Sequence, residues 1–217
     1  MTVLITVWGA SPGVGKSTLC AGLSSWLSDR GLRVDHFREE EVLSRPQFAA
    51  VAAEFETTGR VRPETLIGAT ASFVDAVVAS GDDVVIADAL MPFLPTLLAM
   101  GQDAETINTF MTDLSEVLAP LRPVMVFLDG NAESALSRAV AREGEQWLDW
   151  YLGKLAHYEV TPQVTDAASA VTYLRHERAV TLAAVRRQDW GLVLVERADV
   201  RPRDEVLRIA QRGLKML

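Results

Sequence analysis

The stretch "TVLITVWGASPGVGKST", residues 2–18, joins an apolar run to a loop of small residues that ends in a lysine and two hydroxyls. The apolar run, residues 2–8, has the composition of a strand that is buried on both faces of a parallel sheet. The residues that follow Ser17 have the spacing of an amphipathic helix. We therefore expect a strand, a glycine-rich turn and a helix, and this unit guides the interpretation of the rest of the chain.

The loop fits a pattern that binds nucleoside triphosphates, which is glycine, four residues, then Gly-Lys-Ser or Gly-Lys-Thr. Gly13 and Gly15 allow the backbone to turn its N–H groups towards an anion. Lys16 is placed to bridge the β- and γ-phosphates, and the Ser17 hydroxyl to bind Mg²⁺. The chain departs from the pattern at Ala10, which stands where the first glycine belongs. The predicted ATP-binding residues are Ser11, Gly13, Val14, Gly15, Lys16, Ser17 and Thr18.

Composition limits the class of protein. A chain of 217 residues with 49% apolar and 23% charged residues suits one folded domain, residues 1–217. We find no apolar run of the ~20 residues that span a bilayer and no signal-peptide pattern, so we expect a cytoplasmic protein without a membrane partner. A net charge of −8 disfavours nucleic acid as a partner. The single cysteine, Cys20, excludes an intrachain disulfide, and we expect it to be buried.

Strand and helix patterns alternate along the chain. The expected strands are residues 2–8, 33–37, 83–88, 124–129 and 191–196. The expected helices are residues 17–30, 46–57, 63–80, 103–119, 132–142, 145–158, 166–188 and 203–215. This alternation predicts an α/β fold with a doubly wound parallel sheet, and ligands bind such sheets at the carboxyl ends of the strands.

Acidic side chains follow two of these strands. Glu39 comes after the second strand, where a carboxylate can accept a proton from an acceptor hydroxyl, and Arg38 beside it can pair with phosphate. Asp88 ends the third strand, where a carboxylate can hold Mg²⁺ through water. The alternatives are a solvated charge cluster at residues 38–41 and a helix-capping role for Asp88.

Two arginines follow the fourth strand. Arg138 and Arg142 are four residues apart and share a helix face, from which they can stabilise charge on a transferred phosphate. The alternative is an ordinary helix surface. We interpret the aromatic residues of 147–158 as packing residues in preference to a base-stacking site. We interpret residues 175–187 as an amphipathic helix with solvated charges.

In sequence order, "GVGKST", "GLRV", "HFREE" and "REGE…WYLGKLAHYE" resemble the P-loop nucleoside and nucleotide kinases, specifically the deoxynucleoside kinase and thymidylate kinase group. The resemblance implies a three-layer P-loop fold, a five-stranded parallel sheet in the order 2-3-1-4-5, and a helical lid at about residues 130–160. It implies ATP and Mg²⁺ as cofactors, a small-molecule phosphate acceptor and, by analogy, a homodimer.

The same resemblance implies roles for single residues. Glu39 would act on the acceptor hydroxyl, Arg38 would meet an acceptor phosphate, and Glu145 would be a substrate-facing acid. The lid arginines would be Arg138 and Arg142. The chain departs from the group at Glu40, where the group has proline, and at Ala89, where an arginine that holds substrate or phosphate is expected.

The expected activity is transfer of the γ-phosphate of Mg-ATP to a nucleoside- or nucleotide-like acceptor, with Lys16, Glu39, Arg138 and Arg142 as catalytic residues. Ser17 and Asp88 are the expected metal site. Two alternatives stay open. The loop and first helix are also similar to those of partition-type ATPases, although "GASP" lacks the extra lysine usual there. The other alternative is a kinase of specialised metabolism with an unusual acceptor, which the change at Ala89 favours.

Overall fold

The computed structural model describes residues 2–88, 90, 93–158 and 160–215. Five strands form one parallel sheet in the order β2-β3-β1-β4-β5, which confirms the order that the family resemblance implies. Central strand β1 pairs with β3, with Ile5 opposite Ile86, and with β4, with Val7 opposite Val126. The strands are β1 (Val3–Trp8), β2 (Val34–Phe37), β3 (Val84–Ala87), β4 (Val124–Leu128) and β5 (Gly191–Val195).

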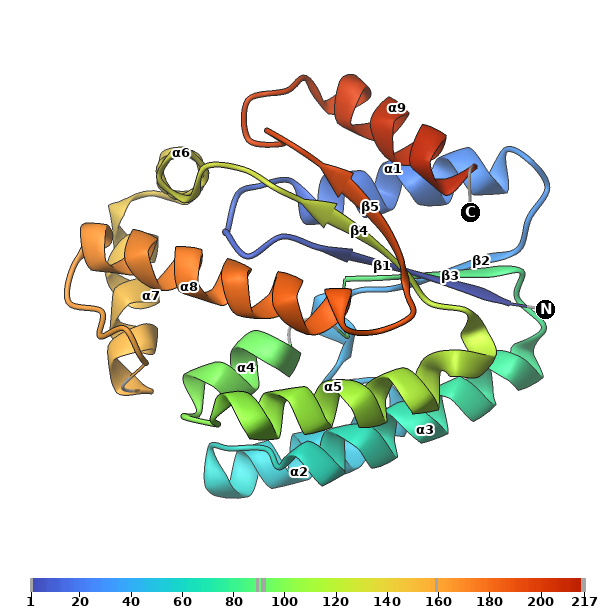
Figure 1. The fold of residues 1–217 in the computed structure, drawn as a ribbon, viewed down its shortest axis with the longest axis horizontal. Helices are drawn as coiled ribbons and strands as arrows, with labels where there is room; N and C mark the ends of the chain where they lie inside the picture. Colours follow the sequence, from blue (N-terminus) through green and yellow to red (C-terminus); the bar gives the residue numbers. More distant parts are fainter. Residues whose placement is uncertain (1, 89, 91–92, 159, 216–217) are drawn as a thin grey trace.

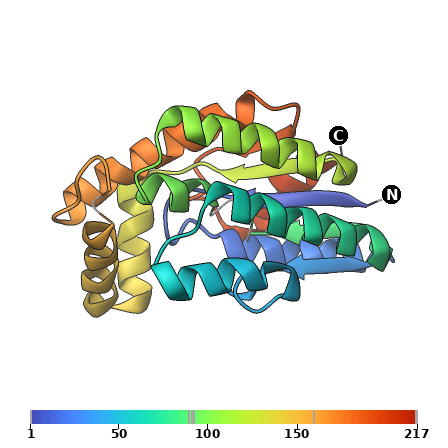
Figure 2. The same ribbon diagram turned by 90° about the horizontal axis from the view of Figure 1, so that it is seen from below.

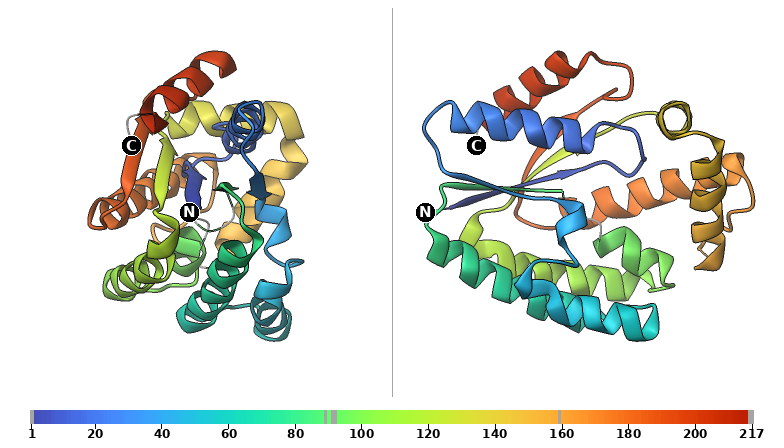
Figure 3. Two further views of the ribbon diagram at one scale, coloured as in Figure 1. Left: turned by 90° about the vertical axis from the view of Figure 1, so that its right-hand side faces the viewer. Right: turned by 180° about the vertical axis from the view of Figure 1, so that it is seen from behind.

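Helices cover both faces of the sheet, which gives three layers (Figures 1 and 3). One face carries α1 (Lys16–Ser28) and α9 (Arg203–Leu214). The opposite face carries α2 (Ala49–Thr58), α3 (Pro63–Ser80), α4 (Phe93–Ala99), α5 (Ala104–Leu118) and α8 (Ala167–Arg186). Figure 2 shows α3 and α5 side by side across this face. Helices α6 (Ala132–Glu143) and α7 (Glu145–His157) lie beyond the carboxyl ends of the strands.

Alternate residues of each strand serve the two faces, because strand side chains point in opposite directions in turn. In β1, Leu4 packs in the cluster beneath α3 and α5, whereas Ile5 and Val7 pack in the cluster beneath α1 and α9. This explains the continuous apolar runs of the sequence, since both faces are dry. In this buried setting Cys20 of α1 is fully buried, as expected.

A third apolar cluster lies outside the sheet and joins α6, α7 and α8. Leu136, Leu155 and Leu174 come from the three helices and are all buried. The lid is therefore a packed helical layer with a core of its own. In the described part of the chain, none of the helices has the length and apolar character that crossing a membrane requires.

Helix α4 is the element that the sequence analysis did not predict. Its stretch contains Pro95, which disfavours a helix interior because proline has no N–H. Here Pro95 is the third residue of Phe93–Ala99, in the first turn, where that N–H has no helical partner in any case. Phe93, Leu94 and Leu97 are buried, so tertiary packing stabilises this short helix.

A cluster of aromatic rings packs on the face of the sheet that carries α3 and α5. The rings of Phe37, Phe48 and Phe73 lie 5.0–6.1 Å apart, and Phe93 lies 6.1 Å from Phe48. These rings come from β2, the turn before α2, α3 and α4. They fix the helices that border the carboxyl edge of the sheet on this side.

We expect Phe73→Ala to lower the free energy of unfolding by about 3–5 kcal/mol, because Phe73 is 1% exposed and its loss leaves a cavity beside its two aromatic neighbours, Phe37 and Phe48. The matched control is Val78→Ala on the same helix, where the side chain is 59% exposed and the change should stay within about 0.5 kcal/mol. Urea denaturation measures both. Equal effects of the two substitutions would contradict this assignment of the core.

Candidate functional site

The loop between β1 and α1 has the backbone that its glycines predict. Gly13 and Gly15 have positive φ angles of 78° and 108°. A Cβ on Gly13 would lie 2.6 Å from the carbonyl oxygen of Ala135 in α6, so both conformation and space require glycine there. Gly15 is the N-cap of α1, and no side chain of a described residue caps this helix. The N–H groups of its first turn are therefore available to an anion.

Lys16 lies half-buried at the centre of the site. Its Nζ donates a hydrogen bond of 3.1 Å to the carbonyl oxygen of Gly9 and lies 4.8 Å from the centroid of the Trp8 ring. Burial lowers the pKa of Lys16, while the nearby carboxylates of Glu39, Glu177 and Asp88 oppose that shift. The ammonium is thus held inside a ring of acids at the carboxyl edge of the sheet.

The other predicted loop residues divide between different surfaces. Gly13, Val14, Gly15 and Thr18 line a cavity of about 250 Å³ between the loop, α6 and α9, here named the α6–α9 pocket. Ser11 is buried and borders a different cavity beside β4 and β5. Ser17 is exposed in the first turn of α1.

Asp88 and Glu39 come together, because they follow neighbouring strands of the sheet. The N–H of Glu39 donates a 2.9 Å hydrogen bond to Oδ1 of Asp88, which is 3% exposed. Burial raises the pKa of the Glu39 carboxyl, and the charge of Lys16 lowers it. The residue as a whole is exposed, but its carboxyl borders a pocket next to Lys16.

That pocket, the α4–α8 pocket, has a volume of about 370 Å³ and lies between the loop, α4, α7 and α8. Trp8, Tyr151 and Tyr173 contribute aromatic rings to its wall, and Pro95 and Ala99 of α4 contribute apolar side chains. We interpreted the aromatic residues of α7 as packing residues. Trp147, Tyr151 and Tyr158 do pack against the third apolar cluster, and Tyr151 and Tyr158 also line this pocket. Trp150 is 59% exposed.

Glu177 of α8 is a pocket-lining residue that the sequence analysis missed. We predicted solvated charges over residues 175–187, and for Glu177 this is wrong, because it is 5% exposed and lines the α4–α8 pocket. Burial raises its pKa to about 8. A helical-wheel reading could have found it, since Glu177 is four residues from each of the buried residues Tyr173 and Thr181 and so shares their face.

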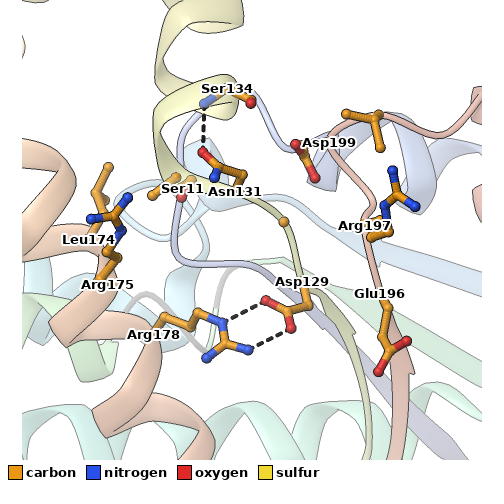
Figure 4. Close-up of a pocket in the computed structure, with 13 residues that line it drawn as sticks. Ser11, Asp129, Asn131, Ser134, Leu174, Arg175, Arg178, Glu196, Arg197 and Asp199 are labelled. Atoms are coloured by element: carbon orange, nitrogen blue, oxygen red, sulfur yellow. Dashed lines mark hydrogen bonds and ion pairs between the residues drawn. The ribbon is translucent and has the colours of Figure 1, made fainter.

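Arg178, the next residue, was also expected to be solvated. Its Nε and Nη2 donate hydrogen bonds of 2.6 and 2.5 Å to the two carboxylate oxygens of Asp129, after the end of β4 (Figure 4). This bidentate pair ties the middle of α8 to the sheet. It also fixes the rotation of α8, with Arg178 towards β4 and Glu177 in the α4–α8 pocket.

The arginines of α6 lie on the other side of the loop. Arg138 and Arg142 both line the α6–α9 pocket, together with Arg201 from the segment after β5. The Nη1 of Arg138 donates to the carbonyl oxygen of Asp199, and Nε of Arg142 donates to Glu143 at 2.6 Å. Asn131 caps this helix by accepting from the N–H groups of Glu133 and Ser134, as Figure 4 shows for Ser134.

Three other positions of the sequence analysis lie elsewhere. Arg38 is exposed after β2 and does not line the α4–α8 pocket. Glu145 is exposed at the start of α7 and is likewise outside both pockets that border the loop. Ala89, the residue in place of the expected arginine, lies outside the described residues.

The buried Glu177 makes a prediction for stability. Its folded pKa of about 8 exceeds the ordinary value of 4.5, so the folded state binds more protons between these pH values. The free energy of unfolding should therefore fall as pH rises from about 4.5 to about 8, with a slope of up to about 1.4 kcal/mol per unit. Lys16 and Lys154 reduce the shift, and Glu39 adds to it. In Glu177→Gln this part of the pH dependence should be absent.

Urea denaturation of both proteins at pH 5, 6, 7 and 8 measures the difference. The control is Glu116→Gln, which removes an exposed carboxylate from α5 and should leave the wild-type pH dependence in place. If the free energy of unfolding changed with pH in the same way for the wild-type protein and for Glu177→Gln, Glu177 would be ionised throughout this range, and the prediction would be wrong.

We compared the chain with known proteins by sequence and by structure. No protein-family model matches the chain, and no curated protein matches its sequence. The structure is similar to that of a thymidylate kinase from Ehrlichia chaffeensis, with a TM-score of 0.58 and 12% sequence identity, over 99% of both chains. At this identity the similarity concerns the fold. The chain therefore has the three-layer P-loop nucleotide kinase fold that its sequence resembles, in the form that this thymidylate kinase has.

Proposed function

We propose that this protein is a kinase that transfers the γ-phosphate of Mg-ATP to a nucleoside- or nucleotide-like small molecule. The observation that carries the proposal is that the phosphate-binding loop separates two pockets. One contains the arginines of α6, and the other contains Glu39 beside Lys16. A phosphotransferase needs this arrangement, because donor and acceptor must meet at one phosphate.

The α6–α9 pocket is the donor side of this proposal. Gly13, Gly15 and the first turn of α1 would hold the phosphates, and Arg138 and Arg142 would neutralise charge on them. The segment from Ala198 to Leu207 also borders this pocket and would hold the base. Among the described residues, Asp204 is the only acidic residue that lines this pocket. The pocket therefore suits an anionic ligand.

Of two groups of residues that could bind Mg²⁺, only one has suitable ligand atoms. Cys20, His36 and Asp88 offer ligand atoms within 4.8 Å of one another, but a thiol and an imidazole are poor ligands for Mg²⁺. The exposed Ser17 hydroxyl is a suitable oxygen ligand, and Asp88 would contribute its charge through water, since it is buried and already accepts the N–H of Glu39. When bound, Mg²⁺ would neutralise charge on the β- and γ-phosphates.

The α4–α8 pocket is the acceptor side. The acceptor oxygen would form the new bond to the γ-phosphorus while the bond from that phosphorus to the β–γ bridging oxygen breaks and ADP leaves. Glu39 would take the proton of an acceptor hydroxyl, and Lys16 would balance negative charge on the transferred group. A pocket of this kind on the far side of the lysine favours a kinase over a partition-type ATPase, which requires no acceptor.

We expect Lys16→Ala to lower acceptor-dependent ADP formation by about 10²–10³-fold, because the charge at the transferred phosphate is lost. Glu39→Gln should lower it by about 10²–10⁴-fold, because the group that takes the proton is lost. The measurement is ADP release from Mg-ATP with a panel of nucleosides, nucleoside monophosphates and hydroxylated metabolites.

Glu40→Gln is the control, because Glu40 is the exposed neighbour of Glu39 and borders neither pocket. It should keep wild-type turnover. Full turnover by folded Lys16→Ala and Glu39→Gln variants would refute the assignment. ADP release that no acceptor stimulates would instead favour the ATPase, and nucleotide-dependent dimerisation would support it further.

A further inference from the structure

The charges of the α4–α8 pocket limit what it can accept. Among the described residues, four charged side chains line it, namely Lys16, Lys154, Glu39 and Glu177. None of these is an arginine. Once ATP engages Lys16, the remaining side chains are one lysine and two carboxyls. A phosphate on the acceptor would then have Lys154 as its one cation among the described lining residues, and its charge would oppose ionisation of Glu39 and Glu177, which is an unfavourable setting for a dianion.

The arginines near the pocket do not supply the positive charge that a phosphate would need. Arg38 is exposed outside the pocket. Arg45, on the same side of the sheet, is engaged by Asp35 at 2.7 Å and by Glu41 at 2.8 Å. Arg138 and Arg142 border the α6–α9 pocket, on the donor side of the loop. Arg60 donates a 3.3 Å hydrogen bond to the carbonyl oxygen of Met100 but is not itself a lining residue. Among the described residues that line the α4–α8 pocket there is therefore no arginine, the side chain that binds phosphate in a bidentate way.

Glu177 is the most deeply buried acid of the pocket wall. The residue is 5% exposed, and it lines the pocket. Its position is fixed, because Arg178 next to it is held by Asp129 (Figure 4). Burial is the largest cause of the raised pKa of Glu177, so a hydrogen-bond donor on a ligand in this pocket would stabilise its carboxylate.

The rest of the wall suits a flat or cationic group. Trp8, Phe55, Tyr151, Tyr158 and Tyr173 line the pocket around the carboxyls. The Tyr151 ring is backed by a parallel stack on Trp147, with centroids 5.2 Å apart. Aromatic faces with a carboxylate between them bind rings and ammonium groups, and they offer nothing specific to a phosphate.

We propose that the acceptor is a phosphate-free alcohol that carries a ring and an N–H donor, amine or amide, with the donor bound by Glu177 and the hydroxyl placed at Glu39. The inference deepens the proposed function, since it names the substrate class of the same site. It makes Glu177 a specificity-determining residue, and it separates this pocket from one that binds a nucleoside monophosphate.

Equilibrium binding tests this without catalysis. Isothermal titration of the wild-type protein, with a non-hydrolysable ATP analogue and Mg²⁺ present, is run against matched pairs of compounds. The pairs are the 2′-deoxynucleosides and ribonucleosides with their 5′-monophosphates, and glucosamine with glucosamine 6-phosphate. We expect at least one phosphate-free member to bind, and its phosphorylated partner to bind at least tenfold more weakly.

The same titrations with Glu177→Gln and Glu116→Gln locate the effect. Glu177→Gln should weaken binding of the phosphate-free compound about tenfold or more, whereas Glu116→Gln, an exposed change on α5, should not alter it. Tighter binding of a phosphorylated member, binding that is indifferent to Glu177, or no binding by any phosphate-free member would each overturn the inference.

ADP release measured with the same compounds separates this inference from the proposed function. Binding that follows the expected pattern without any phosphate transfer would refute the kinase and leave the binding specificity standing. Transfer to a 5′-monophosphate in preference to its nucleoside would support the kinase and overturn the phosphate-free acceptor.

Discussion

The contact between the glycine-rich loop that joins β1 to α1 and helix α6 is the constraint on which the rest of the site depends. At Gly13 the loop backbone approaches the carbonyl oxygen of Ala135 so closely that a single Cβ would clash. The loop is thereby held between the end of β4 and the lid, and it divides the carboxyl edge of the sheet into two pockets. Both the order of the strands and the position of α6 are needed to create this division.

The second constraint is electrostatic. Lys16 is drawn out of water and has Glu39, Asp88 and Glu177 around it, each from a different element of the fold. Burial disfavours the charged forms of Lys16, Glu39 and Glu177, and their mutual attraction offsets only part of that cost, because the pKa of Lys16 stays lowered and those of Glu39 and Glu177 stay raised. An anionic ligand bound to Lys16 would partly neutralise the positive charge that the neighbouring carboxyls experience. Ligand binding at the loop is therefore coupled to the protonation of these carboxyls.

The pair of Asp129 and Arg178 connects the two constraints. It joins the end of β4 to α8, and a rotation of α8 away from this pair would withdraw Glu177 from the pocket. Its role is positioning, since the pair borders a separate cavity next to β4 and β5 and not the α4–α8 pocket. The similarity to a thymidylate kinase concerns the fold, and the side chains that line the pocket are a property of this sequence.

The sequence alone determined the sheet, its parallel strands, the phosphate-binding loop and the grouping of Glu39 and Asp88 with Lys16, because these follow from local periodicity and from the rule that parallel strands share one carboxyl edge. Only the tertiary structure revealed that α4 forms, that Tyr151 and Glu177 line a pocket, and that Arg38 and Glu145 lie outside it. The physical reason is that a helix presents a charged residue to solvent or to a pocket according to its rotation. That rotation is set by contacts far away in the chain, such as Arg178 with Asp129, 49 residues apart.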